Sequence, residues 1–331
     1  MKKETDFGLM TRRDFARVTA VAGLSIMAAP YISLGAPPAG KPTTRVLGRT
    51  GFETTTLGLG GQASLQWTPE GENPEHIIIK ALSLGINYFD TSNLYGPSQL
   101  NYGKAFRTLN LIPGNPGYDE VKRRSIYLAS KTRLRYAKGE PTTERPVKDF
   151  TNGLPGSKTI DDVKRTLSQI FGDGQGNYPP GAYADLFQIH SLQTIDDVDA
   201  IYEGLENPDP KAERIGALAA LRDYRDGTNL TGLNPKNEKL IRHIGITGHL
   251  SSPVLMECLQ RDEKNLIDTL LVALNANDRR YFNHQYNVIP VAVAKNAGLI
   301  AMKVFADGAM YGKGNFFSRA PEHVVRLTCP R

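Results

Sequence analysis

Cysteine and histidine are scarce in this sequence. The 331 residues include two cysteines, Cys258 and Cys329, and six histidines without an HExxH arrangement. Two distant cysteines provide neither a disulfide framework nor the paired CxxC spacing of a zinc site. The composition therefore argues against a small disulfide-stabilised fold and against a metal-dependent hydrolase, and we expect no bound metal.

A dense block of positive charge is also missing. The chain has 40 lysine and arginine residues against 34 aspartates and glutamates, which gives a formal charge of +6. Part of the excess lies near the N-terminus, and no long basic run or RNP-like aromatic pattern follows it. Nucleic-acid binding is therefore not expected. With 40% hydrophobic residues, the chain is large enough to bury a full core and to form an enzyme.

A long apolar run near the N-terminus is missing too. The stretch Val18–Ala29 has 12 residues, whereas a membrane span needs about 20. It follows Thr11-Arg12-Arg13-Asp14-Phe15-Ala16-Arg17, which resembles a twin-arginine export signal. We expect residues 1–39 to be this signal and a linker, with the twin-arginine export machinery as partner. The protein is then periplasmic, or tethered to the membrane if the signal is not cleaved. The alternative to a signal is that this segment forms a buried amphipathic helix.

From Thr43 onward, β-rich runs alternate with segments of helical period, as in parallel α/β folds. We therefore expect residues 43–331 to form a (β/α)8 TIM barrel, with a short hairpin over residues 45–54 covering one end. The strand candidates begin at Thr54, Ile86, Ser125, Ala184, Arg242, Thr269 and Leu299. Helix candidates begin near Pro74, Ser98, Thr159, Arg214, Ser251 and Val288, and Thr159 and Thr194 are expected helix caps.

Two parts of this barrel are unusual. A closed barrel of this class needs eight strands, yet only 28 residues follow Lys303. We expect the last βα unit to be absent from this chain; the alternative is a short, irregular eighth strand. Residues 132–158 are too long and too rich in proline and glycine for a simple connection, and we expect them to form a lid or a pocket wall.

Two short motifs imitate a Rossmann dehydrogenase. Residues Gly58–Ala63 fit GxGxxA after a strand, and residues Tyr127–Lys131 fit YxxxK. A phosphate-binding glycine turn must open directly into a helix, but QWTPEGENPE follows, and we expect no helix before Pro74. The YxxxK residues lie in a run that alternates like a strand, not on a helix face. Both motifs are therefore interpreted as parts of the barrel.

Four titratable side chains stand where predicted strands end. Asp90 closes INYFD, Lys131 closes SIYLASK and His190 closes ADLFQIH. Tyr95 follows Asp90 by five residues. Each residue alone has a structural explanation, such as a helix cap or a core polar group. Together they indicate a proton-transfer site, because the C-terminal strand ends of a parallel barrel form its catalytic rim.

These four groups suit carbonyl reduction. A phenol is a poor acid at neutral pH unless a neighbour stabilises its anion. Lys131 can stabilise the Tyr95 anion with its ammonium group, and Asp90 can keep that ammonium charged and oriented. His190 can donate a hydrogen bond to a substrate oxygen on which negative charge develops.

From about Val46 to Gly308 the chain resembles the aldo-keto reductase family. The resemblance rests on LGRTG from Leu47, LGLGG from Leu57, GINYFDT from Gly85, Tyr95-Gly96, Lys131 and His190, all in order. It implies a (β/α)8 barrel that binds NADPH or NADH and reduces an aldehyde, ketone or sugar carbonyl. It also implies Tyr95 as proton donor, Lys131 and Asp90 as the groups that tune it, and His190 as the residue that orients the carbonyl.

The resemblance further implies which residues hold the cofactor. Family members usually place Ser-Asn after the fifth strand, where this chain has Thr247-Gly248-His249. Thr247 is expected to replace the serine. His249 is expected to supply the hydrogen-bond donor that the amide of the missing asparagine would provide. Asn275 fits the usual amide position after the sixth strand. Met302 stands where many members stack an aromatic ring, and Lys303 is expected to reach a phosphate.

Two other functions stay open. A non-catalytic, nicotinamide-nucleotide-binding redox sensor on the same fold would hold the cofactor tightly without turnover. A hydrolase on the same barrel would act without any nicotinamide.

Overall fold

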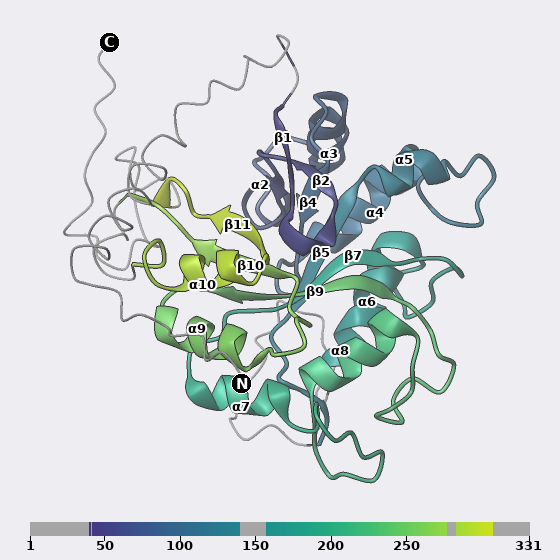
Figure 1. Ribbon diagram of the computed structural model, residues 1–331. Helices are drawn as coiled ribbons and strands as arrows, with labels where there is room; N and C mark the ends of the chain where they lie inside the picture. Colours follow the sequence, from purple (N-terminus) through teal and green to yellow (C-terminus); the bar gives the residue numbers. More distant parts are fainter. Residues whose placement is uncertain (1–39, 41, 140–156, 277–282, 307–331) are drawn as a thin grey trace, which may run out of the picture. The chain divides into compact units, whose positions relative to one another are not determined.

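The computed structural model describes residues 40, 42–139, 157–276 and 283–306. Its central sheet has seven strands, paired in parallel and in chain order (Figure 1). They are β3 (Leu59–Gly60), β4 (Tyr88–Asp90), β5 (Tyr127–Thr132), β7 (Ala184–Ile189), β9 (Ile241–Gly248), β10 (Thr269–Ala273) and β11 (Gly298–Met302). Sequence predicted one strand at each of these places, and the α/β class with a parallel sheet is confirmed.

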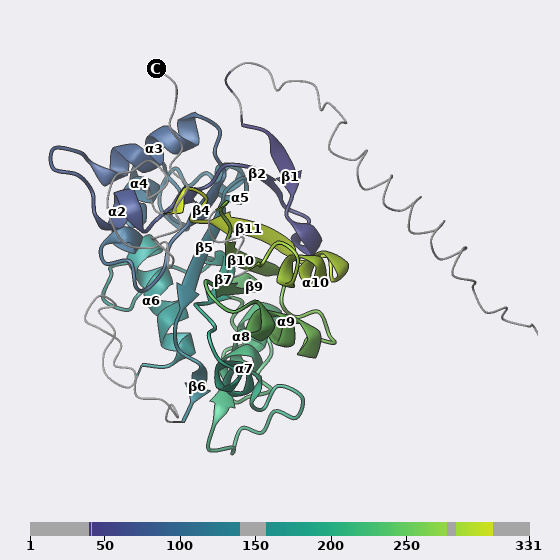
Figure 2. The ribbon, with the colours of Figure 1, turned by 90° about the vertical axis from the view of Figure 1, so that its left-hand side faces the viewer.

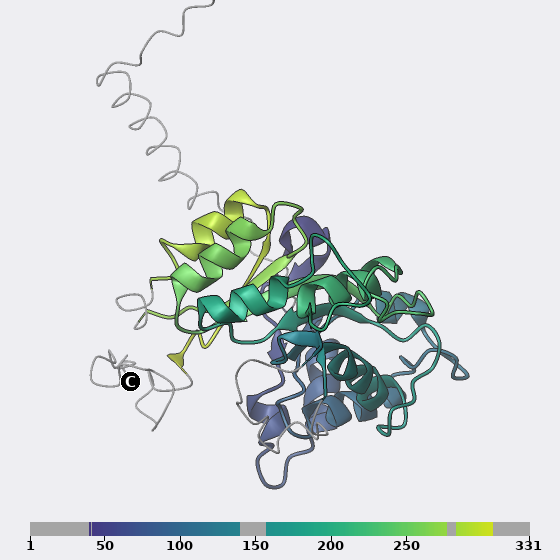
Figure 3. The same ribbon diagram turned by 90° about the horizontal axis from the view of Figure 1, so that it is seen from below.

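The helices pack in a row against this sheet, each touching the next. In order around the sheet they are α3 (Pro74–Ser83), α4 (Ser98–Thr108), α6 (Thr159–Phe171), α8 (Ala217–Asp226), α7 (Ile195–Tyr202), α9 (Ser252–Arg261) and α10 (Val288–Ala294). Seen from below, α7, α9 and α10 run side by side from teal to yellow (Figure 3). The main hydrophobic cluster lies between strands and helices. Within the described ranges, no helix is long and apolar enough to cross a membrane.

Local chemistry explains where several helices begin. Asn73 caps α3 by accepting a 2.9 Å hydrogen bond from the Glu75 amide, and Pro74 occupies the first helical position. Thr194 caps α7 as expected, accepting from the Asp197 amide at 3.1 Å. Thr159, in contrast, is the first residue inside α6 and not its cap, because Lys158 holds the cap position.

A second, smaller cluster fills the inner face of the sheet. It joins Leu47 to Tyr88, Tyr127, Ala129 and Leu186. Leu47 belongs to the predicted hairpin, formed by β1 (Thr44–Val46) and β2 (Glu53–Thr55) around the 3-10 helix η2 (Gly48–Thr50). Figure 2 shows this hairpin beside β11 and α10. The hairpin therefore covers the end of the sheet opposite to the one at which the strands terminate.

Three further local predictions were wrong. The run from Thr54 to Gly60 is not one strand but two, since β2 pairs with β1 and only β3 joins the central sheet. A four-residue helix, α2 (Ala63–Gln66), follows directly after β3, where no helix was expected before Pro74. Helix α8 begins at Ala217, later than predicted, because Ile215–Gly216 form strand β8.

The expected lid is partly regular structure. Within residues 132–158, Tyr136–Lys138 form strand β6, which pairs antiparallel with β8. Residues 140–156 lie outside the described residues. So do residues 1–39, the predicted signal, and residues 307–331, on which the expected absence of a final βα unit depends. Among the described strands, no pairing joins β3 to β11.

Close packing requires a glycine at Gly61, an x position of the GxGxxA motif. A side chain at Gly61 would place its Cβ 2.5 Å from the Asp90 carbonyl oxygen and 2.5 Å from the Ser98 hydroxyl. The glycine thus lets the turn after β3 pack on the end of β4. The helix that follows has only four residues and ends at Gln66, with Trp67 as its C-cap. Of the two motif glycines, Gly58 would place a Cβ 2.6 Å from Tyr88 Cδ1, whereas a Cβ at Gly60 would meet no atom within 4 Å, so close packing explains Gly58 but not Gly60.

Candidate active site

The ends of β4, β5 and β7 bring three of the four rim residues together. Asp90 ends β4, Lys131 is the penultimate residue of β5, and His190 follows β7 directly. The strands are neighbours in the sheet, with Lys131 paired to Gln188 in the register. Tyr95 lies in the turn between β4 and α4, with its amide donating to the Ser92 carbonyl at 3.1 Å.

Lys131 and Asp90 form a buried ion pair. The Lys131 side chain is 1% exposed, and its Nζ donates to Asp90 Oδ1 and, at 2.9 Å, to the Thr91 carbonyl oxygen. Burial by itself lowers the pKa of a lysine, but the charge of Asp90 and the phenol of Tyr95 outweigh it and raise the pKa of Lys131. The ammonium group is therefore charged at neutral pH.

The Asp90 carboxylate is held from further sides. Its Oδ2 atom accepts from Gln188 Nε2 at 3.3 Å and from the Tyr88 hydroxyl at 3.5 Å. Burial of Tyr88 and, after it, the negative charge of Asp90 keep the pKa of Tyr88 well above its ordinary value. The Tyr88 hydroxyl therefore stays protonated and acts as a donor. Tyr88 and Gln188 were not among the predicted site residues. Each lies two residues before a predicted one and, by strand alternation, on the same face.

Tyr95 stands over this ion pair. The residue is 8% exposed, and Lys131 Nζ lies 4.9 Å from the centre of its ring. The His190 ring meets the Tyr95 ring edge-on, with 5.9 Å between centroids. A phenol, an ammonium and an imidazole thus share one buried corner of the rim.

His190 is a neutral imidazole. Burial, followed by the positive charge of Lys131 and further neighbours, holds the pKa of His190 well below its ordinary value. Its Nδ1 atom lies 3.4 Å from the Ser92 hydroxyl, and its backbone amide donates to the Thr132 carbonyl at 2.7 Å. A neutral imidazole bonded through one nitrogen presents its other nitrogen to the rim, where it can donate to a carbonyl oxygen.

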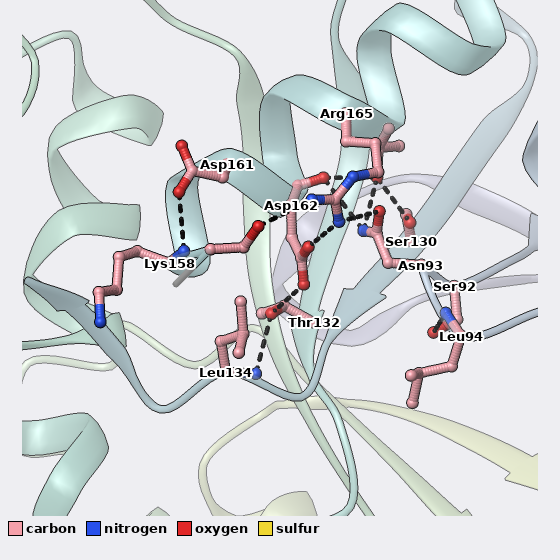
Figure 4. Close-up of polar contacts among 12 residues, drawn as sticks. Ser92, Asn93, Leu94, Ser130, Thr132, Leu134, Lys158, Asp161, Asp162 and Arg165 are labelled. Atoms are coloured by element: carbon pink, nitrogen blue, oxygen red, sulfur yellow. Dashed lines mark hydrogen bonds and ion pairs between the residues drawn. The ribbon is translucent and has the colours of Figure 1, made fainter. Parts of the chain in front are cut away.

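A buried polar network fixes the turn that carries Tyr95 (Figure 4). Asn93 Nδ2 donates to the Lys131 carbonyl at 3.2 Å and to the Asp162 carbonyl at 3.0 Å. The Asp162 carboxylate accepts from the Thr132 hydroxyl at 2.6 Å and pairs with Arg165. Burial raises the pKa of Asp162 to about 6, although the Thr132 and Arg165 contacts act in the opposite direction. Helix α6 thus anchors the turn after β4 and the end of β5.

The predicted cofactor residues divide into two places. Thr247 and His249 lie at the end of β9, beside His190: the Thr247 hydroxyl accepts from the Ser191 amide at 2.8 Å, and the rings of His249 and His190 are 6.2 Å apart. Asn275 lies two residues after β10, and Met302 is the last residue of β11. There, Asn275 Nδ2 donates to the Lys303 carbonyl at 3.2 Å.

These side chains fit a nicotinamide dinucleotide by their chemistry. The Thr247 hydroxyl and the Asn275 amide combine donors and acceptors, as a carboxamide requires. Lys303 brings a cation suited to a phosphate. Among the described residues, no group of three His, Cys, Asp or Glu side chains could hold a metal ion.

One family model matches most of this chain. The model of the aldo/keto reductase family matches residues 56–323. Among solved structures, a putative aldo-keto reductase from Pseudomonas aeruginosa is 21% identical, with 80% of this chain and 81% of that chain covered and a TM-score of 0.47. An aldo/keto reductase from Klebsiella pneumoniae, solved in complex with NADP and acetate, is 16% identical, with 82% and 70% covered and a TM-score of 0.47.

Proposed function

The chain belongs to the aldo/keto reductase family of NADP(H)-dependent oxidoreductases, and we propose that it reduces an aldehyde, ketone or sugar carbonyl with Tyr95 as proton donor. One observation carries this proposal. The Tyr95 ring lies against the ammonium group of the buried Lys131–Asp90 pair and edge-on to a neutral His190.

Each rim residue has a distinct part in this proposal. NADPH, when bound, supplies the hydride that reduces the carbonyl carbon. Tyr95 holds the proton that the carbonyl oxygen takes up, and the charge of Lys131 stabilises the phenolate that remains. Asp90 keeps Lys131 charged and fixed. His190, being neutral, donates a hydrogen bond that orients the carbonyl oxygen without giving up its own proton.

We propose that Thr247, His249 and Asn275 hold the nicotinamide end of NADPH or NADH, that Met302 packs on it and that Lys303 pairs with a phosphate. The chemistry of this donor set supports the assignment. A quench or enhancement of nucleotide fluorescence on titration tests it, and Asn275→Ala should weaken binding without changing the fold.

Titration of the chain with NADPH and NADH, followed by a panel of aldehydes, ketones and sugars, tests the function as a whole. Binding with turnover supports the reductase. Tight binding without turnover of any carbonyl would favour the redox sensor. Hydrolysis of an ester panel without nicotinamide would favour the hydrolase, and the absence of nucleotide binding would overturn the hydride-transfer proposal.

We also propose that residues 1–39 direct export to the periplasm through the twin-arginine machinery. The sequence from Thr11 to Arg17 supports this, since that pathway requires its paired arginines. Changing Arg12 and Arg13 together to lysine keeps the charge, and we expect it to leave the protein in the cytoplasm. Cell fractionation of both forms, with Lys2→Arg as control, measures this; equal distribution of both forms would contradict export by this route.

A further inference from the structure

Arg135 makes an unusual set of contacts beside the rim. It lies between β5 and β6 and donates from Nη1 to the His190 carbonyl at 3.0 Å and from Nη2 to the Ser191 carbonyl at 2.9 Å. Its Nε pairs with Asp197 Oδ1 at 2.7 Å. All three nitrogens of one guanidinium group are therefore engaged, two of them by consecutive carbonyl oxygens at the end of β7.

The backbone at this strand end is strained. Ser191 has a φ of +59°, in the left-handed region that residues with a side chain rarely adopt. Two side chains bond the Ser191 backbone itself. Thr247 Oγ1 accepts from the Ser191 amide at 2.8 Å, and Arg135 donates to the Ser191 carbonyl. The His190 and Leu192 amides donate to the Thr132 and Thr247 carbonyls and hold the turn on either side, so loss of the Arg135 contact would shift the Ser191 peptide and the imidazole before it by a small amount.

Asp197 fixes Arg135 in turn. Their side chains are 12% and 21% exposed, so this pair is more enclosed than an ordinary surface ion pair. The Asp197 carboxylate also accepts from the Gln193 amide at 2.8 Å at the start of α7. Burial opposes ionisation of Asp197, but these bonds outweigh it and lower the pKa of Asp197. Arg135 is thereby tied to a charged group on a helix that the sheet supports.

We propose that Arg135 is a positioning residue for His190: anchored by Asp197, it fixes the two carbonyl groups that follow the imidazole and so sets where that imidazole stands on the rim. The proposal rests on the proposed reductase function for its kinetic consequence, but not for its structural one. Arg135 touches neither the reacting atoms nor the rim side of His190; its hydrogen bonds reach only the backbone, and its charge acts on the ring from a distance.

A geometric role can be separated from a role of charge. His190 faces Lys131 from β5, Arg133 and Arg135 from the loop after it, His249 from the end of β9, and the neutral Ser92 and Tyr95 from the turn after β4. Arg135→Lys keeps the positive charge but cannot reach two carbonyls and Asp197 together. Arg135→Met removes the charge as well.

A double-mutant cycle tests the positioning. We expect Arg135→Lys to lower kcat for carbonyl reduction by roughly 10- to 100-fold in the chain with His190, with the NADPH Kd unchanged, because small misplacements at a reacting centre cost about this much. In a His190→Gln background the same change should have an effect of only about twofold, since the group that it positions is gone. Arg214→Lys, which alters an arginine paired with Glu203 away from the strand end, is the matched control and should retain activity.

The titration of His190, followed by NMR of its ring protons in the full chain, gives a readout independent of reduction. Arg135→Lys should change the His190 chemical shifts but not its pKa, and Arg135→Met should change the shifts and raise the pKa. Unchanged shifts in both variants, or an equal loss of kcat with and without His190, would overturn the proposal. If no carbonyl is reduced by any form, the proposed function fails, while the NMR result still decides whether Arg135 positions His190.

Discussion

Replacing Tyr95 by phenylalanine is expected to lower kcat for carbonyl reduction by about 10²- to 10⁴-fold, the range typical for loss of a general acid. The change removes one oxygen and leaves the ring, which packs edge-on to His190 and over the Lys131 ammonium. Because the ring contacts survive, the fold and the affinity for NADPH should be nearly unchanged. Steady-state kinetics together with a nucleotide titration separate these two effects.

Tyr127→Phe is the matched control for this change. Tyr127 is the tyrosine of the YxxxK motif, but it begins β5 and packs against Phe52 under the N-terminal hairpin, with 4.8 Å between the ring centroids. Lys131 lies four positions further along the extended strand, a span of about 13 Å. We expect Tyr127→Phe to retain reduction. Loss of activity in this variant with retention in Tyr95→Phe would contradict the roles proposed for the rim.

The position of the rim residues was predictable because it depends on chain direction. Once β4, β5 and β7 are parallel and adjacent, residues at their C-terminal ends must lie at one edge of the sheet. Asp90, Lys131 and His190 each end a run with strand character, so their proximity follows from local patterns alone. No knowledge of side-chain packing was needed to group them.

Contacts that depend on packing between distant segments were not predictable. Arg135 reaches His190 only because β6 turns away to pair with β8, more than seventy residues later, and neither short strand has a distinctive pattern. The two-residue β8 was interpreted as the start of a helix. Likewise, the sequence places Asn93 in a turn, but it does not show that α6 packs beside this turn. The Asn93 amide donates to the carbonyl of Asp162 only because α6 lies there. Periodicity does not encode such contacts.

A second large effect is expected at the opposite end of the sheet, where Arg123→Met should lower the free energy of unfolding by about 3–5 kcal/mol. Arg123 is fully buried, donates to Asp185 Oδ2 at 2.9 Å and to the Tyr183 carbonyl at 2.8 Å, and lies 4.1 Å from the centre of the Tyr183 ring. Its removal leaves the Asp185 carboxylate buried with less compensation for its charge. Urea unfolding followed by circular dichroism measures the loss.

The neighbouring Arg124 provides the control for this stability effect. Its ion pair with Glu120 lies on the surface, with the side chains 65% and 58% exposed, so Arg124→Met should change stability by no more than about 1 kcal/mol. If the cost at Arg123 comes from the buried carboxylate it leaves behind, adding Asp185→Leu should recover part of the stability, because replacing both partners of a buried pair costs less than removing one. If the double variant is less stable than Arg123→Met, the loss of stability comes instead from two other contacts. One is the packing of the arginine on Tyr183, and the other is the 3.0 Å hydrogen bond that the Leu128 amide donates to Asp185.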